Sequence, residues 1–123
     1  CQAEIGSASG MAAAAICSVR GGSKEQMGYA CAMALKNLMG LVCDPVAGLV
    51  EVPCVKRNVG GAVNALAAAD MALAGIASHI PVDQVIDAMG EVGMKMDVSL
   101  RETSMGGVAT SPKGLEIAER LGM

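Results

Sequence analysis

The sequence predicts an all-α domain, a bundle-like set of helices interrupted by one long irregular loop that bears cysteines. Its 123 residues are enough for one small domain. Hydrophobic residues make up 53% of the chain but aromatic residues only 1%, whereas a β-sandwich would be rich in aromatic and β-branched residues. Because only 17% of the residues are charged, the composition also excludes intrinsic disorder.

Five helices are predicted, each from its own start and stop signals. The first, over residues 4–19, is rich in Ala, the residue of highest helix propensity, and ends at the glycine pair 21–22. The second begins with a capping box formed by Ser23 and Gln26, and it runs to about residue 40.

Three more helices follow an irregular segment. Residues 41–57 contain Asp-Pro, Gly and a second Pro, which fit neither a continuous helix nor a central strand. The third helix is predicted over 58–78, and a fourth over 81–94 opens at its proline. After a glycine-containing loop, Ser111-Pro112 caps a last helix over 113–121.

Charge and hydropathy exclude two classes of partner. A net charge of −3 and a single aromatic residue, Tyr29, argue against binding to nucleic acid. The most apolar stretches are short or contain polar and charged residues, so we expect buried helices and no membrane span. No signal peptide is visible, and we expect a cytoplasmic protein.

The chain begins with Cys1 rather than Met. Processing, lipidation or a cut through a longer protein would each produce such a start. Helices this apolar require neighbours, which favours a piece of a longer protein. A homo-oligomer is a further option.

The five cysteines divide into two groups. An odd number of cysteines without a secretory signal favours reduced thiols. Cys17 and Cys31 fall within apolar helical stretches, where we expect them to pack as small hydrophobic residues. Cys1, Cys43 and Cys54 lie at element ends or in the loop, where thiolates can converge on soft metals or iron–sulfur clusters. No Cys-x-x-Cys pair is present, so spacing alone leaves packing, metal binding and catalysis open.

Several short motifs along the chain match the sequence of one known family. They are Cys1-Gln2-Ala3-Glu4-Ile5-Gly6, the run from Leu41 to Cys54 with its Val-Cys-Asp-Pro and Val-Pro-Cys sequences, Arg57-Asn58, Leu100-Arg101-Glu102-Thr103 and Gly106-Gly107. These motifs closely resemble the α chain, or catalytic domain, of iron–sulfur-dependent L-serine dehydratases. The resemblance runs over essentially all 123 residues.

The resemblance implies a lyase that deaminates L-serine to pyruvate and ammonia by β-elimination of water. It implies a 4Fe–4S cluster held by Cys1, Cys43 and Cys54, with one open iron acting as a Lewis acid on the serine hydroxyl. It also implies that this chain is the C-terminal part of the α chain. The partners would be the rest of that chain and a β domain or subunit, and this part alone would be inactive.

The irregular segment also concentrates polar side chains, namely Asp44, Glu51, Lys56, Arg57 and Asn58. Lys56 and Arg57 are candidates for binding the substrate carboxylate, because guanidinium offers a two-pronged hydrogen bond. Asn58 is expected to cap the next helix or to donate to the substrate. Asp44 and Glu51 are candidates for bonds that orient the cluster ligands, although for Asp44 a local turn before the proline is favoured. A plain helix connection with its charges in water is the alternative.

Other polar residues have weaker signals. Glu4 is expected to stabilise the start of its helix rather than to face the site. His79, the only histidine, lies at a helix end and is expected to be structural or exposed, which places the general base outside this chain. Arg101, Glu102 and Thr103 match a segment of the family, but the sequence assigns them no role beyond a polar loop near the site.

Two other functions remain open from the sequence. One is a cysteine desulfidase-type lyase of the same superfamily, in which sulfide replaces hydroxide as the leaving group. The other is a helical interaction subunit without a cofactor, whose Ala-rich helices pack against a partner.

Overall fold

The computed structural model describes residues 1–123, and it confirms the all-α prediction, since it contains helices and no strand. The π-helical turn η1 and the α-helices are η1 (Gln2–Gly6), α1 (Ser7–Val19), α2 (Lys24–Asn37), α3 (Cys54–Leu73), α4 (Val82–Lys95) and α5 (Pro112–Arg120). Three short 3-10 turns lie between them, η2 (Val46–Gly48), η3 (Val98–Leu100) and η4 (Gly107–Thr110). None of the helices is both long enough and apolar enough to span a membrane.

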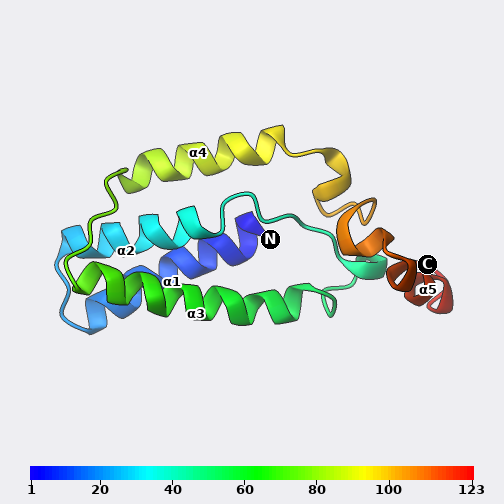
Figure 1. Cartoon of the computed structure of the whole chain (residues 1–123), viewed down its shortest axis with the longest axis horizontal. Coiled ribbons are helices and arrows are strands. Elements are labelled where there is room, and N and C mark those ends of the chain that lie inside the picture. The colour runs from blue at the N-terminus through cyan, green and yellow to red at the C-terminus, as the bar shows by residue number, and fades with distance from the viewer.

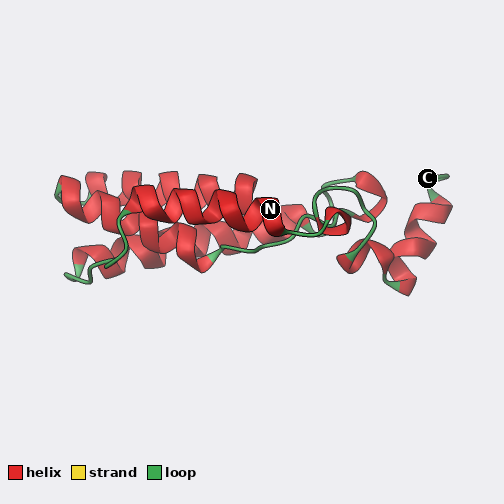
Figure 2. Cartoon of the chain, turned by 90° about the horizontal axis from the view of Figure 1, so that it is seen from above, coloured by secondary structure: helices red, strands yellow, loops and turns green.

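Helices α1, α2 and α3 pack on one another, and α4 lies along α2 (Figure 1). The four run in alternating directions, so the start of α1, the start of α3 and the end of α4 lie at one end of the bundle. Helix α5 lies apart from the bundle, packed against η2 and η4 (Figure 2). The core between α1, α2 and α3 consists mostly of alanine side chains, which allow the helix axes to approach closely.

The predicted end of α1 and the predicted starts of α2 and α5 are confirmed by the backbone. The amide N of Gln26 donates to Ser23 Oγ (3.1 Å), and the amide N of Ser23 donates to Gln26 Oε1 (2.9 Å), which completes the capping box. Ser111 Oγ accepts from the amide N of Gly114 (3.2 Å) at the start of α5. Gly21 has a φ of +85°, which ends α1 in the left-handed conformation that glycine favours.

The prediction for the third helix is wrong at both ends. Helix α3 begins at Cys54 instead of residue 58, and the amide N of Arg57 already donates to the Pro53 carbonyl (3.1 Å). It ends at Leu73 instead of residue 78, because Gly75 adopts a left-handed φ of +91° that stops the helix.

The irregular loop is correspondingly shorter than predicted. Residues 38–53 connect α2, which ends at Asn37 rather than near residue 40, with α3. This loop contains the turn η2 and a cis peptide bond between Val52 and Pro53. It carries Cys43, whereas Cys54 belongs to the first turn of α3.

The contact between η1 and α3 depends on a glycine, which has no side chain. A Cβ atom at Gly61 would lie 2.7 Å from Cγ2 of Ile5, a residue that is 2% exposed. Gly61→Ala is therefore expected to lower the free energy of unfolding by about 1–3 kcal/mol through overpacking. Urea denaturation of the purified chain measures this change.

The neighbouring Gly60 provides the matched control. It lies in the same helix, and a Cβ atom there would meet nothing within 4 Å. Gly60→Ala is expected to raise the free energy of unfolding by about 0.5–1 kcal/mol, because alanine has the higher helix propensity. Equal effects of the two substitutions would contradict a tight contact at Gly61.

Candidate functional site

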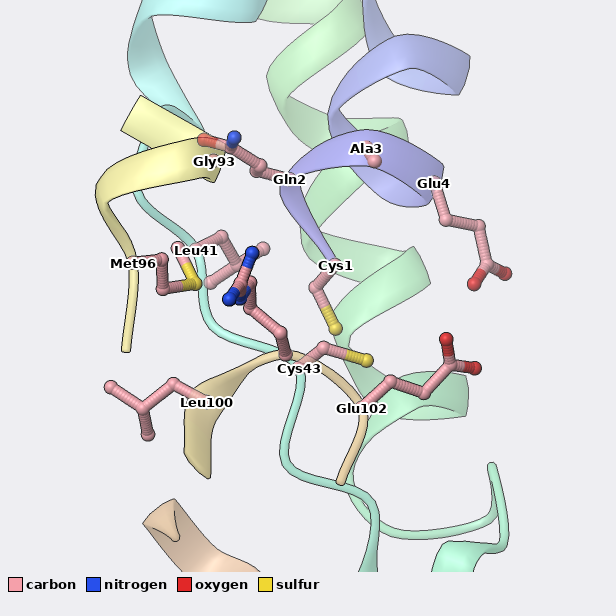
Figure 3. A pocket seen from close by; sticks show the side chains of 11 residues that line it. Cys1, Gln2, Ala3, Glu4, Leu41, Cys43, Gly93, Met96, Leu100 and Glu102 are labelled. Carbon is pink, nitrogen blue, oxygen red and sulfur yellow. The ribbon is translucent and has the colours of Figure 1, made fainter. Parts of the chain in front are cut away.

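Three of the five cysteines lie together at one end of the bundle. Cys1 and Cys54 are buried in one apolar cluster with Ile5, and Cys43 packs against this cluster. In Figure 3 the side chain of Cys1 points toward the side chain of Cys43. All three thiols are free. Residues that are far apart in the sequence therefore present their thiols to one small region.

Two of these thiols stand at the N-terminal ends of helices. Cys1 precedes η1, and its carbonyl accepts the amide N–H groups of Ile5 (2.8 Å) and Gly6 (3.1 Å). Cys54 is the first residue of the 20-residue helix α3. The helix macrodipole favours negative charge at the start of a helix, an effect that burial of the Cys54 side chain opposes.

Cys43 is fixed through its backbone to a segment almost 60 residues further along the chain. Its amide N donates to the Leu100 carbonyl (2.9 Å), and its carbonyl accepts from the amide N of Glu102 (2.9 Å). These bonds form an isolated parallel bridge between Cys43 and Arg101. The loop 38–53 and residues 100–102 are thereby held as one unit beside the thiols.

Arg57 connects the loop to Cys1. Its Nη1 donates to Asp44 Oδ1 (2.5 Å) and to the Val42 carbonyl (3.0 Å), and it lies 3.6 Å from the sulfur of Cys1. The other carboxylate oxygen of Asp44 accepts from the amide N of Val108 (2.7 Å). The expectation that Asp44 closes a local turn is therefore wrong, because its carboxylate joins α3 to η4.

The environment of Asp44 favours its charged form. Its side chain is 2% exposed, and this burial raises the pKa. The hydrogen bonds from Arg57 and from the amide of Val108, together with the charge of Arg57, outweigh burial and leave the pKa below its usual range. Asp44 is thus a buried carboxylate with both of its oxygens bonded.

The pKa of the Cys54 thiol is shifted in the opposite direction from that of Asp44 and is raised. Burial raises its pKa, and a negative charge at the neighbouring Cys43 would raise it further, while Arg57 opposes both.

A pocket of about 270 Å³ opens beside Cys1 and Cys43. It is lined by Cys1, Gln2, Ala3, Glu4, Leu41, Cys43, Gly93, Met96, Leu100, Arg101 and Glu102 (Figure 3). Gln2 is buried and fixes this wall, since its amide group binds the Met89 carbonyl (2.8 Å) and the amide N of Gly40 (2.8 Å). Glu4 lies in the first turn of η1, as expected, and it also lines the pocket.

The remaining predicted site residues lie outside this pocket. Glu51 and Lys56 are exposed and form no ion pair. Asn58 does not cap a helix, because its side chain donates to the carbonyl of Cys54 (3.0 Å) within α3. His79 is exposed in the connection between α3 and α4, at the opposite end of the bundle (Figure 1).

The other two cysteines are placed as predicted. Cys17 is completely buried in the alanine core of the bundle. Cys31 is half-buried against the side chains that join α2 to α4, and burial raises its pKa. Neither contributes to the group around Cys1.

No three histidine, cysteine, aspartate or glutamate side chains surround a common point at the spacing that a single metal ion requires. The three thiols thus do not form a mononuclear site of the zinc type. In an iron–sulfur cluster each thiolate binds its own iron atom, so the ligands enclose a larger volume.

Two features of the site were missed from the sequence. The bond from Asp44 to the amide of Val108 joins residues 64 positions apart. Gly107 makes it possible, because it has a φ of +63° and a Cβ atom there would lie 2.6 Å from Cβ of Asp44. The Gly106-Gly107 pair was the available signal, but it indicated only a loop. The second feature is that Arg101 and Glu102, expected only as part of a polar loop near the site, line the pocket itself.

Comparison with known sequences shows which proteins the chain is similar to. The family model described as serine dehydratase alpha chain matches residues 1–109. The chain is 64% identical over 121 residues to the probable L-serine dehydratase, alpha chain, of Bacillus subtilis (strain 168), covering 98% of this chain and 40% of that protein. It is 54% identical over 117 residues to the L-serine dehydratase, alpha chain, of Peptoniphilus asaccharolyticus, covering 95% and 40%.

A more distant relative is L-serine dehydratase 1 of Escherichia coli (strain K12), which is 46% identical over 110 residues and of which 24% is covered. The chain spans between 40% and 56% of the length of the alpha chains that it matches.

Proposed function

The chain belongs to the serine dehydratase alpha chain family, and from this premise we propose that it carries part of the active site of an L-serine ammonia-lyase. The reaction would convert L-serine into pyruvate and ammonia. The names of the relatives support this substrate, and the grouping of three thiols beside a pocket with charged side chains is the observation that carries the proposal.

The proposed cofactor is a 4Fe–4S cluster held by Cys1, Cys43 and Cys54. Three free thiols from three separate segments, grouped in apolar surroundings, suit a soft metal cluster better than a single ion. When bound through only three thiolates, such a cluster would supply one Lewis-acidic iron for the hydroxyl group of serine.

The protein's own residues would prepare this site. The helix N-termini at Cys1 and Cys54 stabilise negative sulfur. Arg57 directs a hydrogen-bond donor toward the sulfur of Cys1, and Asp44 fixes the position of Arg57. Ile5 and the apolar side chains packed around it exclude water from one side of the thiols.

The chemistry that follows is an elimination without a redox change. A base removes the α-proton of serine while the β-hydroxyl group leaves, which yields aminoacrylate and water. Aminoacrylate tautomerises to an imine, and hydrolysis of the imine gives pyruvate and ammonia. We assign the base to a part of the enzyme outside this chain, because the only histidine, His79, lies far from the thiols.

The proposed partners are the rest of the α chain and a β domain or subunit. Helices α1 and α3 expose large apolar side chains, among them Met11, Val55, Val59 and Val63. The relatives are longer than this chain by at least 40% of their own length, which supplies sequence to cover these faces.

The test uses the complete enzyme, prepared and reconstituted with iron and sulfide without oxygen. Formation of pyruvate and ammonia from L-serine, in equal amounts and dependent on bound iron, is expected. Faster turnover of L-cysteine than of L-serine would instead favour a desulfidase. Failure to bind iron would favour an interaction subunit without a cofactor.

A further inference from the structure

The pocket beside Cys1 and Cys43 contains three charged side chains that have no partner. Arg101, Glu4 and Glu102 line it, yet none of them takes part in an ion pair. In Figure 3 the carboxylates of Glu4 and Glu102 both lie to the right of the Cys1 and Cys43 sulfur atoms. Charges of both signs, placed in one concave site and left unpaired, are suited to a ligand that also carries both charges.

The segment that carries Arg101 and Glu102 contains two residues in an unfavourable backbone conformation. Glu102 has a φ of +66° and Ser104 a φ of +57°, and both values are unfavourable for residues with a side chain. The conformation is maintained by the bonds of residues 100–102 to Cys43 and by the bond from Ser104 Oγ to the Pro45 carbonyl (2.6 Å). The strained segment is therefore fixed beside Cys43, where it places Arg101 and Glu102 at the pocket.

Arg57, the other cation near the thiols, already has hydrogen-bond partners. Its Nη1 atom donates to Asp44 and to the Val42 carbonyl and lies near the sulfur of Cys1. Arg57 does not line the pocket. Lys56 is exposed and also lies outside the pocket. Arg101 is the only cationic side chain that lines this pocket.

We propose that Arg101 binds the carboxylate and Glu102 the ammonium group of a zwitterionic α-amino acid. This inference rests on the proposed function and assigns its substrate-binding residues. Guanidinium forms paired hydrogen bonds with a carboxylate, and a carboxylate accepts charge-assisted hydrogen bonds from an ammonium group. With both charged groups of the amino acid held in this way, its third substituent is left free to face the thiols that line the same pocket.

The test uses the complete, cluster-loaded enzyme and two ligands that each lack one charge. Ethanolamine retains the ammonium and hydroxyl groups of serine, and 3-hydroxypropanoate retains the carboxylate and hydroxyl groups. Dissociation constants of both are measured by calorimetry in wild type, Arg101→Met and Glu102→Gln, after iron content has been determined. Arg101→Lys retains the positive charge and serves as a second variant at that position.

Arg101→Met is expected to weaken binding of 3-hydroxypropanoate by about tenfold to a hundredfold, the effect of losing a hydrogen bond to a charged group, with little change for ethanolamine. Glu102→Gln is expected to produce the reverse pattern. In both variants the KM for L-serine rises, and Arg101→Lys falls between wild type and Arg101→Met. Arg120→Met and Glu119→Gln, an exposed adjacent pair in α5, should match wild type.

Equal weakening of both ligands in both variants, or no weakening in either, would overturn the assignment. Loss of iron in Arg101→Met and Arg101→Lys alike would also overturn it, because Arg101 would then support the cluster rather than the substrate. If the wild-type enzyme turns over serine normally, such outcomes refute only this inference. If wild type forms no pyruvate, the proposed function itself fails.

Discussion

Replacement of Cys54 by serine is expected to abolish assembly of the iron–sulfur cluster. The substitution removes one of three thiolates and leaves a hydroxyl group, which is a poor ligand for soft metal ions. Serine is close to cysteine in size, so the start of α3 and the apolar contacts with Ile5 should persist. Iron and sulfide per α chain after anaerobic reconstitution of the complete enzyme provide the measurement, and near-complete loss of both is expected.

Cys17→Ala is the matched control for this experiment. Cys17 is equally buried but lies in the alanine core, outside the group of three thiols. Removal of its sulfur leaves a small cavity that should cost about 1 kcal/mol of stability while iron content stays at the wild-type level. Equal loss of iron in the two variants would overturn the assignment of Cys54 as a ligand.

The helices were predictable because their signals are local. The Ser23–Gln26 capping box and the Ser111-Pro112 start depend on residues three positions apart or fewer, and the structure contains both. The start of α3 was missed because residues 41–57 contain several helix breakers. Pro53 precedes the first turn of α3, where a proline does not interrupt a helix, so the helix includes residues 54–57.

The site was predictable only in part, and largely through family resemblance. Local sequence patterns could not predict that Cys1, Cys43 and Cys54 lie together, because their grouping results from the packing of η1, the loop and α3. The partner of Asp44 was still harder to predict, since its carboxylate reaches the amide of Val108. A sequence contains no local signal for hydrogen bonds that cross the fold in this way.

Gly107→Ala is expected to destabilise the protein far more than the same change at Gly48. Both glycines have a left-handed φ, +63° and +72°, so alanine costs about 1–2 kcal/mol at either position. A Cβ atom at Gly48 would meet nothing within 4 Å, whereas one at Gly107 would overlap the Asp44 side chain, 2.6 Å from its Cβ. The overlap should add about 1–3 kcal/mol at Gly107, measured by urea denaturation.

The same overlap predicts that mutations at Gly107 and Asp44 are not additive. Asp44→Ala alone leaves the half-buried Arg57 without its carboxylate, at a cost of about 3 kcal/mol. In the double variant, alanine at residue 44 lacks the carboxylate, so the overlap with Oδ2 and Cγ disappears, whereas the overlap with Cβ remains. The double variant should therefore be more stable than the sum of the single changes predicts, by about 0.5–2 kcal/mol. Strict additivity of the two free-energy changes would mean that residues 107 and 44 are not in contact. The series of contacts from η4 through Asp44 and Arg57 to Cys1 would then be broken between η4 and Asp44.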